Sequence, residues 1–386
     1  EWIRDGAPPF AAPEPLRPFL DHRTIVTALV ADLNRIDRNK QANVRYVSTV
    51  HLYNANVHRE ELESARAALS KLLNSLSLRK NMAAPVAIGD SGALFRIDFT
   101  DYGWARASWD RLLRVYPYGY RYADDGSVQI RVLTGSPIPY LRVDWLTATA
   151  SRAPLYHDIL YRDLMHLGAS PRGFLGALES RLSISRIGNI RRGIAARSGF
   201  NGSGVSQHNR IIERHPIEAR DHGGAYWISY DFAGSSPDPE KRENIFSFPI
   251  GPTELFPGVR RPFRHAGGEV IFNLPNGLQA YVLADNQGNR IDKAPTSIVS
   301  DPARPDRAVE NAVSCMSCHA NGIFPKPDQV RASVTSLERT GTGLQTELVR
   351  RLYAEPATMT AFFNGDAARF RAALRSASAD VDGPEP

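Results

Sequence analysis

The two cysteines of the chain stand three residues apart and are followed directly by a histidine, in the segment Ser314-Cys315-Met316-Ser317-Cys318-His319. This spacing is the signature of covalent attachment of a c-type haem. In that chemistry both thiols form thioethers with the haem vinyl groups, and the adjacent imidazole becomes the proximal ligand of the iron. The segment therefore predicts one covalent haem c, anchored by Cys315 and Cys318 and ligated by His319.

Two other roles are open to a pair of cysteines at this spacing. A thioredoxin-like redox pair follows a strand and opens a helix, whereas residues 306–313 are expected to be helical, which would put the pair late in a helix. A structural zinc site needs a second pair of Cys or His ligands, and the chain has no third cysteine. The haem interpretation is preferred, and the other two stay open as alternatives.

Residues 306–386 resemble the c-type cytochromes, because Cys315, Cys318 and His319 match the attachment motif of that family position for position. The resemblance implies a small, all-α, class I-like haem domain that exchanges single electrons with a redox partner protein, free or within a larger complex. It also implies Met359 as the distal ligand of the iron. The alternative for Met359 is a core position beside Phe362 and Phe363, since methionine commonly fills gaps in apolar cores.

A different function follows if Met359 does not ligate the iron. The distal side would then be open or weakly capped, as in a peroxidase-like haem enzyme or a sensor of small ligands. Polar residues such as Arg214, His215 or His265 would assist bond cleavage there as acid and base. The single attachment motif excludes a di-haem peroxidase, and electron transfer is the favoured interpretation.

Covalent haem attachment takes place outside the cytoplasm, so the motif predicts a periplasmic or otherwise exported protein in a bacterium. The first residues, Glu1-Trp2-Ile3-Arg4, lack an initiator methionine and an apolar core and are interpreted as a mature or trimmed end. A membrane anchor could have preceded them. No run of about 18 apolar residues occurs, and therefore no transmembrane helix is expected.

The chain has a net charge of +6, and its basic excess lies ahead of residue 306. Residues 181–222 hold eight arginines and three acidic residues. They are interpreted either as a docking face for an acidic partner or as the result of an Arg-rich composition, which is preferred. No basic run interleaved with aromatic residues supports nucleic acid binding.

The 386 residues, 42% of them hydrophobic, can form two or three domains with an α+β fold. The predicted organisation is an extended Pro-rich arm (1–20), an α+β domain (21–190), a β-rich segment with a linker (191–305) and the all-α haem domain (306–386). Helices are predicted at 21–36, 56–75, 105–115, 143–150, 155–167 and 171–182, and strands at 44–52, 93–100 and 128–133. A hairpin is expected at 269–283 around Pro275-Asn276-Gly277, because Asn-Gly favours a tight turn. The haem domain is predicted to contain helices at 328–336, 344–353 and 366–376, with Asp366 as the N-cap of the last.

Overall fold

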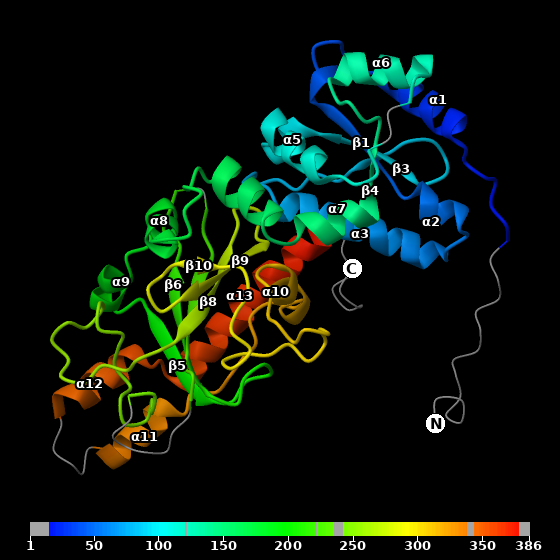
Figure 1. Ribbon diagram of the computed structural model, residues 1–386. Helices are drawn as coiled ribbons and strands as arrows, with labels where there is room; N and C mark the ends of the chain where they lie inside the picture. Colours follow the sequence, from blue (N-terminus) through cyan, green and yellow to red (C-terminus); the bar gives the residue numbers. More distant parts are fainter. Residues whose placement is uncertain (1–14, 120–121, 221, 235–241, 338–342, 378–386) are drawn as a thin grey trace, which may run out of the picture.

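The structure is a computed structural model that describes residues 15–119, 122–220, 222–234, 242–337 and 343–377. Two β-sheets, each flanked by helices, form the body of the protein (Figure 1). This arrangement confirms the predicted mixture of helices and strands. The predicted arm falls largely outside the described residues, since 1–14 are not among them.

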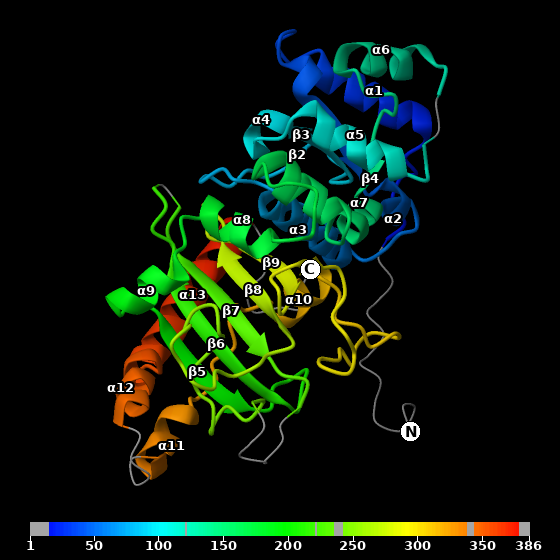
Figure 2. The same cartoon turned by 60° about the vertical axis from the view of Figure 1, so that its left-hand side comes forward.

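The first part of the chain is built around a four-stranded sheet in the order β2-β3-β1-β4. Its elements are α1 (His22–Leu33), β1 (Val44–Ser48), α2 (Val50–Asn54), α3 (Arg59–Ser75), β2 (Val86–Ala87), β3 (Leu94–Asp98), α4 (Phe99–Tyr102), α5 (Arg106–Val115), α6 (Asp125–Thr134), β4 (Leu141–Arg142) and α7 (Val143–Ala150). Every residue of β1 is buried, because α1 and α6 cover one face of the sheet and α3, α5 and α7 cover the other (Figure 2).

The second part contains a six-stranded sheet in which consecutive strands pair antiparallel, from β5 to β10. Its elements are the π-helix His157–Leu164, α8 (Phe174–Arg181), α9 (Arg186–Arg192), β5 (Ala196–Asn201), β6 (Asn209–Pro216), β7 (Ala225–Asp231), β8 (Gly267–Asn273), β9 (Gln279–Asp285), β10 (Arg290–Ile291), α10 (Val313–Cys318), α11 (Val330–Leu337), α12 (Gly343–Leu352) and α13 (Pro356–Ser376). The predicted hairpin is confirmed as β8 and β9, and Gly277 in its turn has φ +91°.

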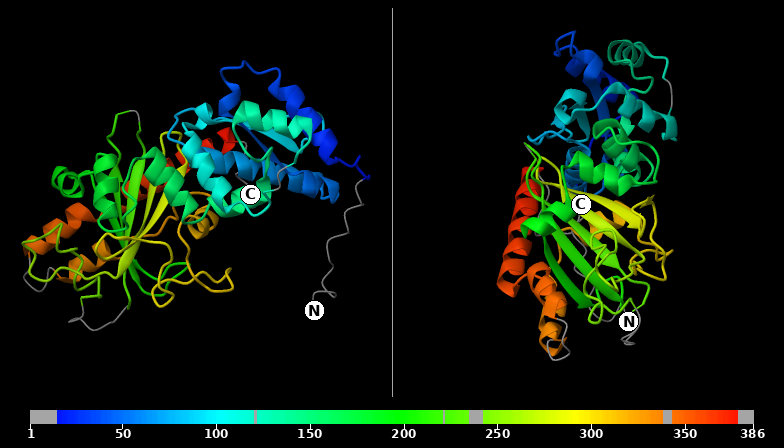
Figure 3. Two further views of the ribbon diagram at one scale, coloured as in Figure 1. Left: turned by 45° about the horizontal axis from the view of Figure 1, so that its top comes forward. Right: turned by 90° about the vertical axis from the view of Figure 1, so that its left-hand side faces the viewer.

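Helices cover both faces of this second sheet, and adjacent residues of β7 identify the two sides. Successive side chains of a strand point to opposite faces. The hydroxyl of Tyr226 donates to Glu179 on α8 at 2.9 Å, whereas the ring of Trp227 stacks on Phe363 of α13. We call the side of Trp227 the α13 face. Helix α10 lies on this face too, because Cys315 shares a buried cluster with Trp227 (Figures 1 and 3).

The predicted all-α haem domain is not present as a separate unit. Helices α10 and α13 bury their apolar residues against the sheet rather than against one another alone. The buried cluster combines the two helices with strands β5, β7, β8 and β9 and consists of Ala196, Ala225, Trp227, Ile271, Tyr281, Cys315, Ile323, Met359 and Phe363. The C-terminal helices therefore complete the second sheet.

Three local predictions were wrong. Residues 128–133 belong to helix α6 and not to a strand. Asp366 lies in the middle of α13 and not at a helix N-terminus. The segment 306–313 is irregular up to the first residue of α10, so the cysteines lie in a short helix that has only just begun.

Hydrogen bonds join the two parts of the chain. The side-chain amide of Asn276 donates to the carbonyl of Asn74 at 2.9 Å, and Nε of Arg152 donates to the carboxylate of Glu310 at 2.8 Å. Among the described helices, none combines the length and the apolar character needed to cross a membrane.

Candidate functional site

Helix α10 carries both cysteines and begins at a strained residue. Ala312 has φ +67° and ψ −65°, and the N–H of Val313 donates to the carbonyl of Asn311 at 3.0 Å. These values describe a γ-turn of the rare, strained form. Ala312 is fully buried, so the surrounding contacts must hold it in this conformation. Such strain is concentrated at functional sites.

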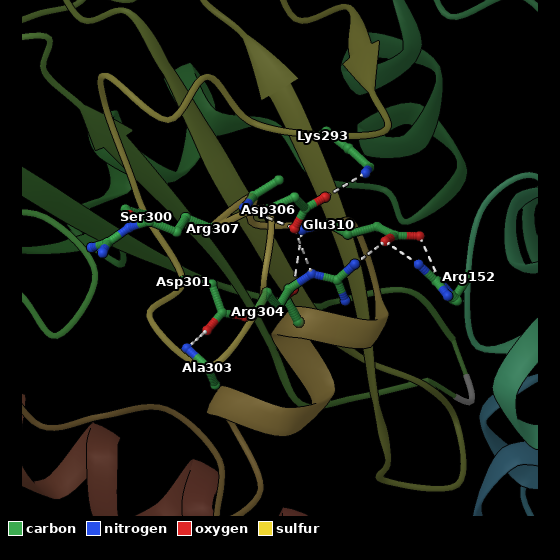
Figure 4. A network of polar contacts seen from close by, with 11 residues as sticks. Arg152, Lys293, Ser300, Asp301, Ala303, Arg304, Asp306, Arg307 and Glu310 are labelled. Atoms are coloured by element: carbon green, nitrogen blue, oxygen red, sulfur yellow. Dashed lines mark hydrogen bonds and ion pairs between the residues drawn. The ribbon is translucent and has the colours of Figure 1, made fainter.

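A network of ion pairs fixes the segment that leads into this turn (Figure 4). The ammonium of Lys293 lies 2.9 Å from the carboxylate of Asp306, which also contacts Arg304 at 3.4 Å. Arg304 then pairs with Glu310 at 2.7 Å, and Glu310 binds Arg152 from the first part of the chain. Glu310 is buried, and the hydrogen bond from Arg152 lowers the pKa of its carboxyl despite that burial.

Asn311 connects the same segment to the π-helix. Its side-chain amide donates to Nε2 of the buried His157, and its Oδ1 accepts the N–H of Leu283 on β9 at 3.1 Å. Burial lowers the pKa of His157 to about 3, which keeps Nε2 free to accept. No sequence signal pointed to this role, since nothing local relates His157 to a residue so distant in the chain.

The two cysteines differ in exposure, and neither is an activated thiolate. Cys315 is 2% exposed, whereas Cys318 is half-buried. Burial raises the pKa of both thiols, and the carboxylate of Glu269 raises that of Cys315 further. A reactive cysteine has a depressed pKa. The environment is therefore unsuited to a thioredoxin-like pair, even though the cysteines lie near the start of a helix.

His319 ends α10 and is held in a defined orientation. Its Nδ1 lies 3.1 Å from the carbonyl of Gly322, and because a carbonyl can only accept, Nδ1 carries the proton. Gly322 allows the chain to turn back here with φ +100°. This second hydrogen bond is what normally orients a ligating imidazole. The ring also contacts Phe324, which is 54% exposed, with 5.1 Å between ring centroids.

The other ring nitrogen, Nε2, faces a carboxylate that the sequence did not single out. Oε2 of Glu269, on the α13 face of β8, lies 3.5 Å from His319 Nε2. The thiol of Cys315 donates to the same carboxylate. Burial disfavours the charge on Glu269, but His319 and Cys315 outweigh burial and lower the pKa of the carboxyl. The structure thus brings Glu269 together with the predicted site residues.

Met359 lies in the first turn of α13 and is 3% exposed. It packs in the cluster that contains Cys315, Trp227 and Phe363. This position agrees with the core alternative, and ligation of iron by Met359 stays a prediction.

The three residues expected to assist catalysis in an enzyme do not converge. Arg214 lies on the α13 face and binds both carboxylate oxygens of Asp366, at 2.8 and 3.0 Å. His215 is fully buried on the opposite face and contacts Glu213 at 3.0 Å. His265 lines a cavity of about 360 Å³ that is also on that opposite face, next to Arg186.

The arginine-rich segment 181–222 is largely neutralised within the fold. Most of its arginines form ion pairs with carboxylates: Arg186 with Glu179, Arg192 with Glu218, Arg197 with Glu213, Arg210 with Asp231 and Arg214 with Asp366. The preferred interpretation, that these arginines do not form a docking face, agrees with this pairing.

Comparisons of the chain with models of protein families, with curated proteins and with solved structures found no match. The assignment to the c-type cytochromes is therefore corrected. No family model supports it, the chain has only the two cysteines of one motif, and the described residues contain no group of three His, Cys, Asp or Glu side chains that could hold a metal ion. The Cys-x-x-Cys-His motif of this chain lies in a helix that packs on a β-sheet.

Proposed function

We propose that Cys315 and Cys318 bind one haem c covalently, that His319 ligates its iron, and that the protein transfers single electrons. The proposal concerns the three residues and their surroundings, and it does not depend on membership of any family. Because haem is joined to thiols outside the cytoplasm, it includes export of the protein.

The orientation of His319 is the observation that carries the proposal. The hydrogen bond from Nδ1 to the carbonyl of Gly322 leaves Nε2 as the nitrogen available to a metal. A histidine at the end of a short helix, directly after the second cysteine, supplies the proximal ligand that a haem iron needs. An iron held by a porphyrin requires few protein ligands, so a cluster of three side chains is not needed.

The side chains around the cysteines are apolar on one side and accessible to solvent on the other, as a haem with one exposed edge would require. Cys315 lies among Ile323, Met359 and Phe363, and these side chains offer apolar contacts of the kind a porphyrin face requires. Cys318 and Phe324 are accessible from solvent. Bound haem would supply a reversible one-electron couple, and the exposed side would allow a redox partner protein to approach.

The alternatives for the cysteine pair have less support. Both thiols have raised pKa values, which opposes thiol–disulfide exchange. The described residues offer no second pair of ligands that would complete a zinc site.

The test is production of the full chain in a bacterial host that exports it and has the machinery for haem c attachment. Intact-mass analysis should give the chain plus one haem, and the purified protein should show reversible changes in its visible spectrum on reduction and oxidation. The double variant C315S/C318S should lose the added mass. H222Q is the matched control, because His222 bonds the carbonyl of Asn273 away from the motif and should not affect attachment. The bare mass of the chain for the native protein would refute the proposal.

A further inference from the structure

We infer that the cavity lined by His265 binds a small organic cation, namely a protonated amine with an apolar body. This cavity has a volume of about 360 Å³ and lies on the side of the second sheet opposite the α13 face. None of its lining residues belongs to the Cys-x-x-Cys-His motif, so the inference goes beyond the proposed function and does not depend on it. The volume falls in the range of about 300–1,000 Å³ that is usual for ligand sites.

One ion pair in the wall of the cavity is balanced within the protein. Nε of Arg186 lies 2.9 Å from the carboxylate of Glu179, and Nη1 of Arg186 donates to the hydroxyl of Tyr230 at 3.1 Å. The same carboxylate accepts from the hydroxyl of Tyr226 at 2.9 Å. The side chains of Arg186 and Glu179 are only 14% and 15% exposed. Because the guanidinium and the carboxylate neutralise each other, this pair adds no net charge to the cavity.

Two further carboxylates line the cavity, and no described arginine or lysine forms an ion pair with either of them. Glu254 is exposed and has no hydrogen-bond partner for its side chain among the described residues. Asp285 accepts from the backbone N–H groups of Gln287 and Asn289, at 2.8 and 2.9 Å. Partial burial raises the pKa of Asp285, but its hydrogen bonds with Asn289 and Gln287 outweigh burial and the pKa is lowered. The cavity therefore carries a net negative charge.

His265 can accept a hydrogen bond from a cation in this cavity. Its ring packs edge-on against Tyr230 and Phe263, with 5.2 and 6.2 Å between ring centroids. Burial and the charge of Arg186 lower the pKa of His265 to about 4, so at pH 7 the ring is neutral and one nitrogen is an acceptor. Neither ring nitrogen has a hydrogen-bond partner among the described residues. The imidazole is therefore an acceptor that lacks a donor.

The other walls decide which kind of cation fits. Ile228, Val270 and Ala284 are buried and give the cavity apolar surface, which a metal ion would leave uncovered. The described residues also contain no group of three His, Cys, Asp or Glu side chains that could hold a metal ion. An organic ammonium ion suits both features. Its N–H groups can donate to Glu254 and His265, and its carbon atoms can cover the apolar side chains.

The experiment compares three probes of similar shape and different charge. The full chain is titrated at pH 7 with benzylamine, which is protonated, with benzyl alcohol, which is neutral, and with benzoate, which is an anion. Ligand-observed NMR measures each affinity. Benzylamine should bind at least about tenfold more tightly than benzyl alcohol, which corresponds to about 1.4 kcal/mol, and benzoate should bind more weakly than both.

Two variants locate the bound amine. E254Q removes an exposed carboxylate and should weaken the binding of benzylamine about two- to fivefold. H265F removes the acceptor nitrogen, keeps a ring against Tyr230 and Phe263, and should weaken binding about tenfold. D90N is the matched control for E254Q, because Asp90 is an exposed carboxylate that does not line this cavity, and its affinity for benzylamine should equal that of the native protein.

The native protein alone can overturn the inference, even if H265F fails to fold. Equal affinities for benzylamine and benzyl alcohol, or tighter binding of benzoate, would show that the cavity does not select a cation. An affinity for benzylamine that is unchanged in both E254Q and H265F would place the amine elsewhere and would also overturn the inference. None of these results bears on haem attachment, which the intact mass decides separately.

Discussion

The guanidinium of Arg152 binds both carboxylate oxygens of Glu310, with its Nε donating at 2.8 Å and its Nη2 at 2.6 Å. The pair joins the end of α7 to the segment that carries the cysteines. Glu310 is buried, and its N–H lies 3.1 Å from the hydroxyl of Ser314 in α10. The pair of Arg152 and Glu310 therefore links the first part of the chain to α10.

Loss of this pair should destabilise the protein. R152M leaves Glu310 with Arg304 as its remaining ion-pair partner, and the free energy of unfolding should fall by about 1–3 kcal/mol, the cost of a buried acceptor that loses its donor. Urea unfolding at pH 7 measures the change. R162M is the matched control, because Arg162 is exposed and 3.9 Å from Asp158, and its loss should cost less than about 1 kcal/mol.

The contribution of Glu310 should also depend on pH in a defined direction. Its pKa is lowered in the folded state, chiefly by the hydrogen bond from Arg152. The stabilisation is therefore present above the unfolded pKa and is lost as the pH falls through the folded value. The difference in stability between the native protein and R152M should shrink as the solution is acidified below pH 4.5, the ordinary pKa of glutamate. A difference that stays constant down to pH 3 would contradict the assignment.

His157 should make the stability of the fold depend on pH in a higher range than Glu310 does. Its pKa is about 3 in the folded protein against 6.5 ordinarily, so the unfolded chain takes up a proton that the folded chain does not. Between about pH 6 and pH 4 this one group should lower the free energy of unfolding by about 1.4 kcal/mol per pH unit. H157Q keeps an acceptor for Asn311 and should remove that part of the slope. Parallel stability curves for the two proteins would rule out this role.

The strain at Ala312 should offset the usual cost of a substitution by glycine. Ala→Gly at a buried position normally costs about 1–2 kcal/mol, from lost apolar contact and added chain entropy. At Ala312, relief of a strained backbone worth about 1–3 kcal/mol should offset that cost. A312G should therefore be close to neutral in urea unfolding, while A150G, at an equally buried helical alanine, should lose the usual amount. Equal losses at the two positions would show that Ala312 is unstrained.

The buried pair on the face opposite α10 should be among the most sensitive in the protein. Nε of Arg197 lies 2.5 Å from Glu213, and both side chains are fully buried. R197M should cost about 3–5 kcal/mol, because it removes the cation paired with a carboxylate that is buried in the interior. R192M removes a similar pair at the surface and should leave stability nearly unchanged. Thermal unfolding of the two variants provides the comparison.

Sequence signals gave correct predictions where the interacting residues are close together in the chain. Asp21 caps α1 by accepting from the N–H of Thr24, and Asn276-Gly277 closes the hairpin as expected. The strand predicted at 128–133 failed because its alternating Val128, Ile130 and Val132 resemble a half-buried strand. Only Ile130 is fully buried and Val132 is 72% exposed, while Asp124 caps a helix by accepting from Ser127.

The prediction of a separate all-α haem domain was wrong because of how the C-terminal helices pack. The sequence correctly indicated helices after the motif, but it could not show where their apolar residues go. Phe363 stacks on Trp227 with 5.2 Å between ring centroids, and Asp366 pairs with Arg214. Both partners lie on the second sheet, and so the helices depend on that sheet for their core.

The sequence by itself determined the motif on which the proposed chemistry rests, because a haem c attachment motif is defined by the types and spacing of residues such as Cys315, Cys318 and His319. Tertiary structure alone decided the surroundings of these residues. Folding brings Glu269 to Nε2 of His319 and places Met359 in an apolar cluster, through strand pairing and packing between distant segments. Such long-range contacts leave no trace in the local pattern of residues, because each segment satisfies its own helix or strand preferences whichever partner it meets.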